Sequence, residues 1–184
     1  MSTTTQSLTL EAFLALPETK PAAEFVNGQI IQKPMPQGEH SRLQSKLSAV
    51  INQASEDRKI AYAFTELRCS FGGDSTIPDI AVFRWDKIPR ENSGRIANRF
   101  FIPPDWAIEI LSPDQSETKV LGNLLHCSEH GMELGWLMNP KEETVLLVLP
   151  EQRVRILRGE AVLPVLENIN LSLTVAQVFG WLKF

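Results

Sequence analysis

Two apolar segments that each carry a single acid constrain the fold more than any other feature of the sequence. IPDIAVF begins at Ile77 and contains Asp79, and WAIEILS begins at Trp106 and contains Glu109. An ionised carboxylate in a buried strand is unfavourable unless a partner compensates its charge. We therefore expect two strands that bring both acids to one place, where a divalent metal ion can be that partner.

The composition is that of an ordinary globular protein with a modest negative charge. The chain has 184 residues, of which 43% are hydrophobic and 22% charged, and its formal net charge is −4. We expect a disordered N-terminus over residues 1–7 and a single domain over 8–184. Because the chain is acidic overall, any contact with nucleic acid must use a local basic patch.

Cysteine usage and hydropathy indicate a cytoplasmic protein. Cys69 and Cys127 are the only cysteines, and their spacing suggests no disulfide framework. The sequence shows no signal-peptide pattern and no apolar run near the ~20 residues of a membrane span, so no membrane association is expected. Cys69 alternates with Leu67 and Phe71, which predicts a small core residue in a strand.

The periodicity of the chain predicts an α/β (α+β) fold with a central mixed β-sheet flanked by helices. Asn27-Gly28 between apolar arms is a strong hairpin signal. Ser112-Pro113 should begin a helix that ends at Gly131. Further helices are expected within 8–17, 39–54 and 172–184, and further strands at 61–64, 65–71, 132–138, 143–150 and 153–159.

Several polar residues could assist the two acids, although each has an ordinary alternative. Lys119 would lie about 9 Å along the helix that follows Glu109, and its stem could reach back to the acids. Glu24 lies on the first hairpin arm, and His40 shares a helix face with Gln44. The ordinary alternatives are a solvated strand residue for Glu24, a surface histidine or cap neighbour for His40 and a solvated lysine for Lys119.

A long irregular segment between the two acid-bearing strands is basic in an otherwise acidic chain. Residues 84–99 contain only two acids and five basic residues: Arg84, Lys87, Arg90, Arg95 and Arg99. Long loops inside compact domains are often functional. This loop is either an arm that contacts nucleic-acid phosphates or a solvated loop.

A second constellation, HCSEH, places His126 and His130 four residues apart on one helix. Histidines with this spacing can bind zinc, but Glu129 is not at the metalloprotease position and no third ligand is evident. A helix end with histidines near its negative pole is the simpler interpretation. The sequence has no P-loop, G-x-S-x-G or G-x-G-x-x-G motif, which argues against nucleotide hydrolysis and esterase chemistry.

Taken together, IPDIAVF, WAIEILSP and the helix with DQSETK resemble the Uma-type putative restriction endonuclease family of the PD-(D/E)XK superfamily. The likeness extends to EFVNGQII, EHSRLQSKL, GWLMNP and SLTVAQVFGWL. It implies a restriction-endonuclease-like fold and Mg²⁺-dependent (or Mn²⁺-dependent) cleavage of DNA, with Asp79 and Glu109 as the acids of the motif. Glu24, His40 and Gln44 match further polar positions of the family.

The chain departs from the superfamily at one position. A lysine is expected two residues after Glu109, where Leu111 stands. Lys119 fits the role of a lysine supplied by the following helix, and Asn123 stands where some relatives carry it.

Two hypotheses follow from this departure. The first is a metal-dependent DNA endonuclease, with Asp79 and Glu109 as metal ligands and Lys119, Glu24 and His40 assisting. The second is an inactive nuclease-fold module that acts in binding or assembly. By analogy with nucleases that cut both strands of a duplex, we expect a homodimer.

Overall fold

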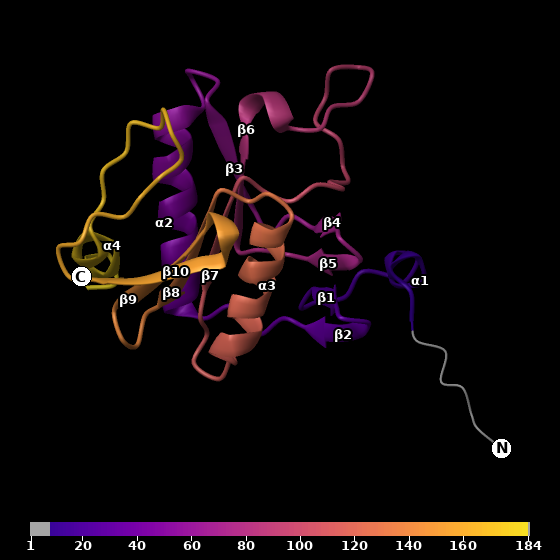
Figure 1. Ribbon diagram of the computed structural model, residues 1–184, viewed down its shortest axis with the longest axis horizontal. Helices are drawn as coiled ribbons and strands as arrows, with labels where there is room; N and C mark the ends of the chain where they lie inside the picture. Colours follow the sequence, from indigo (N-terminus) through magenta and orange to yellow (C-terminus); the bar gives the residue numbers. More distant parts are fainter. Residues whose placement is uncertain (1–7, 184) are drawn as a thin grey trace.

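A six-stranded mixed sheet forms the centre of the molecule, as a computed structural model that describes residues 8–183 shows (Figure 1). Its strand order is β10-β9-β8-β7-β6-β3, and only β7 and β8 are parallel. The strands are β3 (Ala61–Thr65), β6 (Ile80–Arg84), β7 (Trp106–Ile110), β8 (Leu134–Asn139), β9 (Thr144–Leu149) and β10 (Arg153–Arg158). The predicted mixed sheet is confirmed. The N-terminal residues 1–7, which we expected to be disordered, lie outside the described part of the chain.

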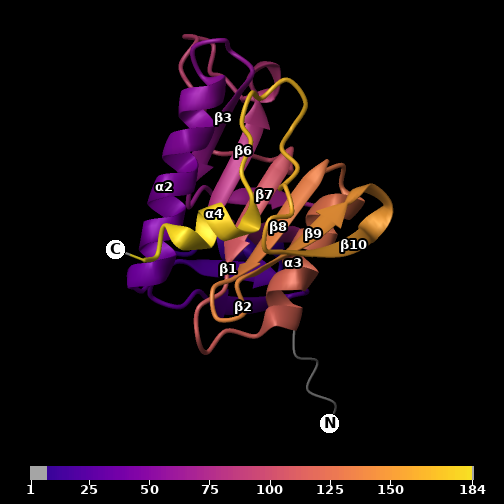
Figure 2. The ribbon, with the colours of Figure 1, turned by 90° about the vertical axis from the view of Figure 1, so that its left-hand side faces the viewer.

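Helices cover both faces of this sheet. On one face, α2 (Gly38–Ser55) and α4 (Val175–Gly180) bury Leu43, Leu47 and Phe179 against the strands (Figure 2). On the other face, α3 (Glu117–Glu129) buries Val120 and Leu124. Because β7 and β8 are parallel neighbours, the chain between them must cross over the sheet, and α3 is that crossover.

A smaller second sheet, which the sequence analysis did not anticipate, packs beside the first. Its strand order is β2-β1-β5-β4, and all its pairs are antiparallel. The strands are β1 (Ala23–Val26), β2 (Gln29–Gln32), β4 (Cys69–Phe71) and β5 (Asp74–Thr76), and α1 (Leu10–Leu14) packs on β1 through Phe13 and Phe25. Asn27 and Gly28 both have positive φ, so the predicted hairpin turn is confirmed.

The start of α3 differs from the prediction. Ser116 is its N-cap, and residues 113–115 form a turn in which the Ser112 N–H donates to the Gln115 side chain over 3.2 Å. This contact closes a turn, and the helix that we expected to begin at Ser112-Pro113 begins at Glu117. Gly131 follows the helix with φ +103°, as expected for a C′ residue.

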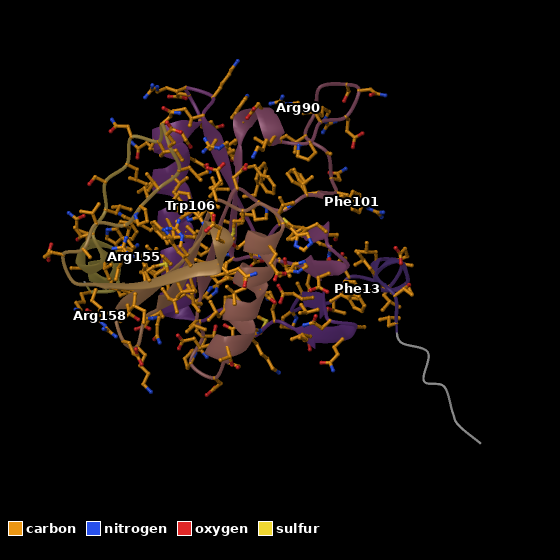
Figure 3. The ribbon with its side chains drawn as sticks, in the orientation of Figure 1. Phe13, Arg90, Phe101, Trp106, Arg155 and Arg158 are labelled. Atoms are coloured by element: carbon orange, nitrogen blue, oxygen red, sulfur yellow. The ribbon has the colours of Figure 1, made fainter. Side chains whose placement is uncertain are left out.

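The other connections include short helical turns and two long loops. The turns are η1 (Trp85–Lys87) and η2 (Pro150–Gln152), and the loops run from η1 to β7 and from β10 to α4. Figure 3 shows buried Trp106 within the main sheet, whereas Arg155 and Arg158 project from the edge strand β10. Charged side chains on an edge strand discourage pairing with another sheet.

Within the described residues, no helix is long and apolar enough to cross a membrane.

Both cysteine thiols should be inert in the native protein. Cys69 and Cys127 are buried, and burial raises the pKa of Cys69 to about 12 and that of Cys127 well above its ordinary value. Since the thiolate is the reactive form, we expect an aromatic disulfide reagent to label neither cysteine at pH 8 until denaturant is added. Rapid labelling of the folded protein would contradict this placement.

Candidate functional site

The site lies where β6 begins and β7 ends. The register of these antiparallel strands pairs Ile80 with Ile108, so one further step brings Asp79 opposite Glu109. Both residues are only 3% exposed. The two acids from distant parts of the chain therefore meet on neighbouring strands.

Glu24 is the third buried acid of this group, at 6% exposure. It comes from β1 in the second sheet, and its Oε1 accepts the Ile77 N–H over 2.7 Å. Its other oxygen, Oε2, accepts from Asn123 of α3 over 3.2 Å. Glu24 thus connects the second sheet, the segment before Asp79 and α3.

The ammonium group beside the acids belongs to Lys33, which follows β2. Its Nζ lies 2.8 Å from Asp79 Oδ1 and 3.7 Å from Glu109 Oε2, and it donates to the Ile77 carbonyl over 2.5 Å. Burial alone would lower the pKa of Lys33, but the charges of Glu109, Asp79 and Glu24 raise it above its ordinary value. Lys33 is therefore held as a cation.

Two residues of α2 complete the surroundings of Asp79. His40 Nε2 lies 3.0 Å from Asp79 Oδ2, and Gln44 donates to the Asp79 backbone carbonyl over 2.8 Å. The Ile110 N–H also donates to Asp79 Oδ2, over 2.7 Å. Burial would raise the pKa of Asp79, but the hydrogen bond from His40 and the charge of Lys33 lower it to about 2.

Glu109 has the opposite electrostatic environment. Burial, together with the charges of Asp79 and Glu24, raises its pKa well above the ordinary value, although Lys33 opposes this shift. Burial likewise raises the pKa of Glu24. Neighbouring carboxylates with divergent pKa values are typical of active sites.

A cleft of about 840 Å³ opens beside this group. Glu24 and Lys33 line it from the second sheet, and Lys119, Asn123 and His126 line it from α3. Its volume is within the range of small-molecule and substrate sites. Glu24 and Lys33 therefore face a space that a substrate can enter, and Lys33 links that space to Asp79 and Glu109, which do not line it.

Lys119 does not occupy the position that we predicted for it. It is exposed on the cleft wall, and within residues 8–183 no ion pair joins it to the acids. Since α3 begins at Glu117, Lys119 lies in the first helical turn and not about 9 Å along the helix. Lys33 takes the place beside the acids. In the sequence it is a single lysine between the end of a hairpin arm and Pro34, and no local pattern marks it as a site residue.

The basic loop also lies away from the acids. It starts at the far end of β6, about 17 Å along the strand from Asp79, and Figure 3 shows Arg90 at the opposite end of the molecule from the β1–β2 hairpin of Figure 1. Arg84 pairs with Glu133 and Lys87 with Asp105. None of the five predicted residues lines the cleft: Arg84, Lys87, Arg90, Arg95 and Arg99.

Comparisons with known proteins agree with this architecture. Residues 10–176 match the model of the Uma2 family, described as "Putative restriction endonuclease". The chain is also similar to the crystal structure of a putative nuclease belonging to DUF820 from Anabaena variabilis, with a TM-score of 0.93. The two chains share 53% sequence identity, and the match covers 95% of this chain and 98% of that one. No curated protein matches the chain.

Replacing Lys33 should destabilise the fold because it leaves three buried carboxylates without their cation. For Lys33→Met we expect the free energy of unfolding at pH 7 to fall by roughly 3 kcal/mol, as for other broken buried pairs. Lys119→Met, at an exposed position, should change it by less than about 0.5 kcal/mol. Urea denaturation of both variants measures the difference, and equal effects would contradict the assignment.

Proposed function

Because the chain belongs to the Uma2 family of putative restriction endonucleases, we propose that it is a metal-dependent DNA endonuclease centred on Asp79, Glu109 and Lys33. The observation that carries this proposal is an ammonium group on the wall of a cleft beside two buried carboxylates. The likeness to a nuclease structure at 53% identity supports the reaction class.

The donor set fits a hard divalent cation. Three buried carboxylates share one ammonium group, so the group can accept a further positive charge when all three are ionised. Carboxylate oxygens are the ligands that Mg²⁺ and Mn²⁺ prefer. Asp79 and Glu109 would hold the ion, whose contribution when bound is to polarise a phosphoryl oxygen and acidify a water molecule.

Lys33 stabilises the negative charge that develops at phosphorus. An ammonium group has three N–H donors, and Asp79 and the Ile77 carbonyl accept two of them. Glu109 Oε2, at 3.7 Å, is beyond hydrogen-bond distance, so the third N–H would be the donor to a non-bridging phosphate oxygen or to the attacking water. Donors fixed before the reaction stabilise a transition state most effectively where water is excluded.

The remaining polar residues position this centre. His40 and Gln44 hold Asp79 from α2, and Glu24 holds the preceding backbone at Ile77. Asn123 ties Glu24 to α3. We assign these residues to positioning because they act on the substrate through Asp79 or through the backbone.

The structure weakens the main reason for the alternative of an inactive module. That reason was Leu111 at the usual lysine position, but Leu111 packs with the apolar cluster under α3, and Lys33 supplies an ammonium group from the hairpin. We therefore favour the endonuclease.

Lys119 on the cleft wall is our candidate contact to a DNA phosphate. The homodimer and the cytoplasmic location stay predictions.

Activity measurements on two lysine variants test the assignment of roles. With Mg²⁺ or Mn²⁺ and supercoiled plasmid, we expect Lys33→Met to lower kcat by about 100-fold, the usual effect of losing one transition-state donor. Lys119→Met should raise KM and leave kcat nearly unchanged. A loss of kcat in Lys119→Met with normal kcat in Lys33→Met would reverse the assignment.

Removal of the acids or of the metal should abolish cleavage. Glu109→Gln keeps the shape of the side chain but removes its charge, so we expect no Mg²⁺-dependent nicking and weaker Mg²⁺ binding by calorimetry. A chelator should have the same effect on the unmodified protein. Normal Mg²⁺ binding without any cleavage by the unmodified protein would favour the binding-module alternative.

A further inference from the structure

The C-terminal half of α3 carries a second group of metal-ligating side chains, separate from the three acids. His126, Glu129 and His130 each offer a ligand atom, and these atoms lie within 4.8 Å of one another. The rings of His126 and His130 are 4.4 Å apart between centroids. We propose that this group is a binding site for a transition-metal ion such as Zn²⁺, distinct from the proposed Mg²⁺ centre.

Backbone carbonyl groups orient both rings for metal binding. His126 Nε2 lies 3.2 Å from the Phe71 carbonyl, and His130 Nδ1 lies 2.8 Å from the His126 carbonyl. A carbonyl oxygen can only accept, so these two nitrogens carry the ring protons. The lone pairs of the neutral rings are then on His126 Nδ1 and His130 Nε2, and metal-ligating histidines are typically oriented in this way.

Packing holds the rings in place. The Phe71 ring stacks on His126 with centroids 5.0 Å apart and meets the edge of His130 at 5.5 Å. His130 occupies the space that a side chain at Gly72 would fill, since a Cβ there would be 2.3 Å from Nε2. The turn between β4 and β5 therefore supports both rings.

Two acids add negative charge around the free ring nitrogens. Asp74 Oδ2 lies 3.8 Å from His126 Nδ1, which is too long for a hydrogen bond and close to the roughly 3.4 Å between two ligands of one zinc ion. Asp74 is buried and its Oδ1 accepts from the Asn27 N–H. Glu129 is oriented by Gln152, which donates to its Oε1 over 2.7 Å.

The ligand chemistry separates this site from the proposed catalytic centre. Imidazole nitrogens favour Zn²⁺, Co²⁺, Ni²⁺ or Cu²⁺, whereas a set of carboxylates favours Mg²⁺ or Mn²⁺. His126 and Glu129 line the same cleft as Glu24, so an ion and its water ligands can enter. An ion there would stabilise the end of α3, the helix whose Asn123 donates to Glu24.

Histidine ring signals in an NMR titration test the proposal directly, because the chain has only three histidines. On addition of one equivalent of Zn²⁺ to the unmodified protein, we expect the His126 and His130 signals to shift and the His40 signal to stay unchanged. The melting temperature should rise by several degrees because the ion binds only the folded state. Shifts confined to His40, or no shift, would overturn the proposal.

Two exposed ligand positions allow variants that should still fold. We expect His130→Ala to weaken Zn²⁺ binding at least tenfold and Glu129→Gln to weaken it less, as measured by calorimetry. Glu142→Gln, at an exposed acid outside the group, is the matched control and should bind normally. Unchanged binding in His130→Ala would refute the site, and Mg²⁺-dependent cleavage by that variant reports separately on the endonuclease.

Discussion

The ion pair of Lys33 with Asp79 and Glu109 is the interaction on which the rest of the site depends. Three carboxylates cannot stay ionised in a nearly dry space unless a cation is close to them. Lys33 follows β2 of the second sheet, whereas Asp79 and Glu109 lie at β6 and β7 of the main sheet. The charge balance of the site therefore requires that the two sheets pack together.

Hydrogen bonds extend this arrangement to the two helices beside it. Gln44 and His40 of α2 hold Asp79, and Asn123 of α3 holds Glu24. Each of these polar groups is attached to an element whose apolar side is buried in the core. The positions of the site residues are consequently set by helix and strand packing, which gives a rigid framework for chemistry.

Several features could be predicted because they depend on local physics. The Asn27-Gly28 turn needs two positive φ angles, and the apolar stripe of α2 repeats with helical spacing. Asp79 and Glu109 were conspicuous because a lone acid in an apolar strand is unfavourable without a partner. The start of α3 was misjudged because Ser112 and Gln115 make a capping contact that also suits a turn.

The sequence by itself determined the strands of the mixed sheet, the helices that cover it and the two acids of the candidate site, because hydrophobic periodicity and isolated charge are local properties of a chain. Only the tertiary structure decided which cation meets those acids. Lys33 and Lys119 are both ordinary lysines in sequence, and packing of the hairpin buries one while the late start of α3 leaves the other exposed. The same packing brought Glu24 to Ile77 and removed the basic loop from the cleft, since contacts between distant segments depend on how the layers are assembled.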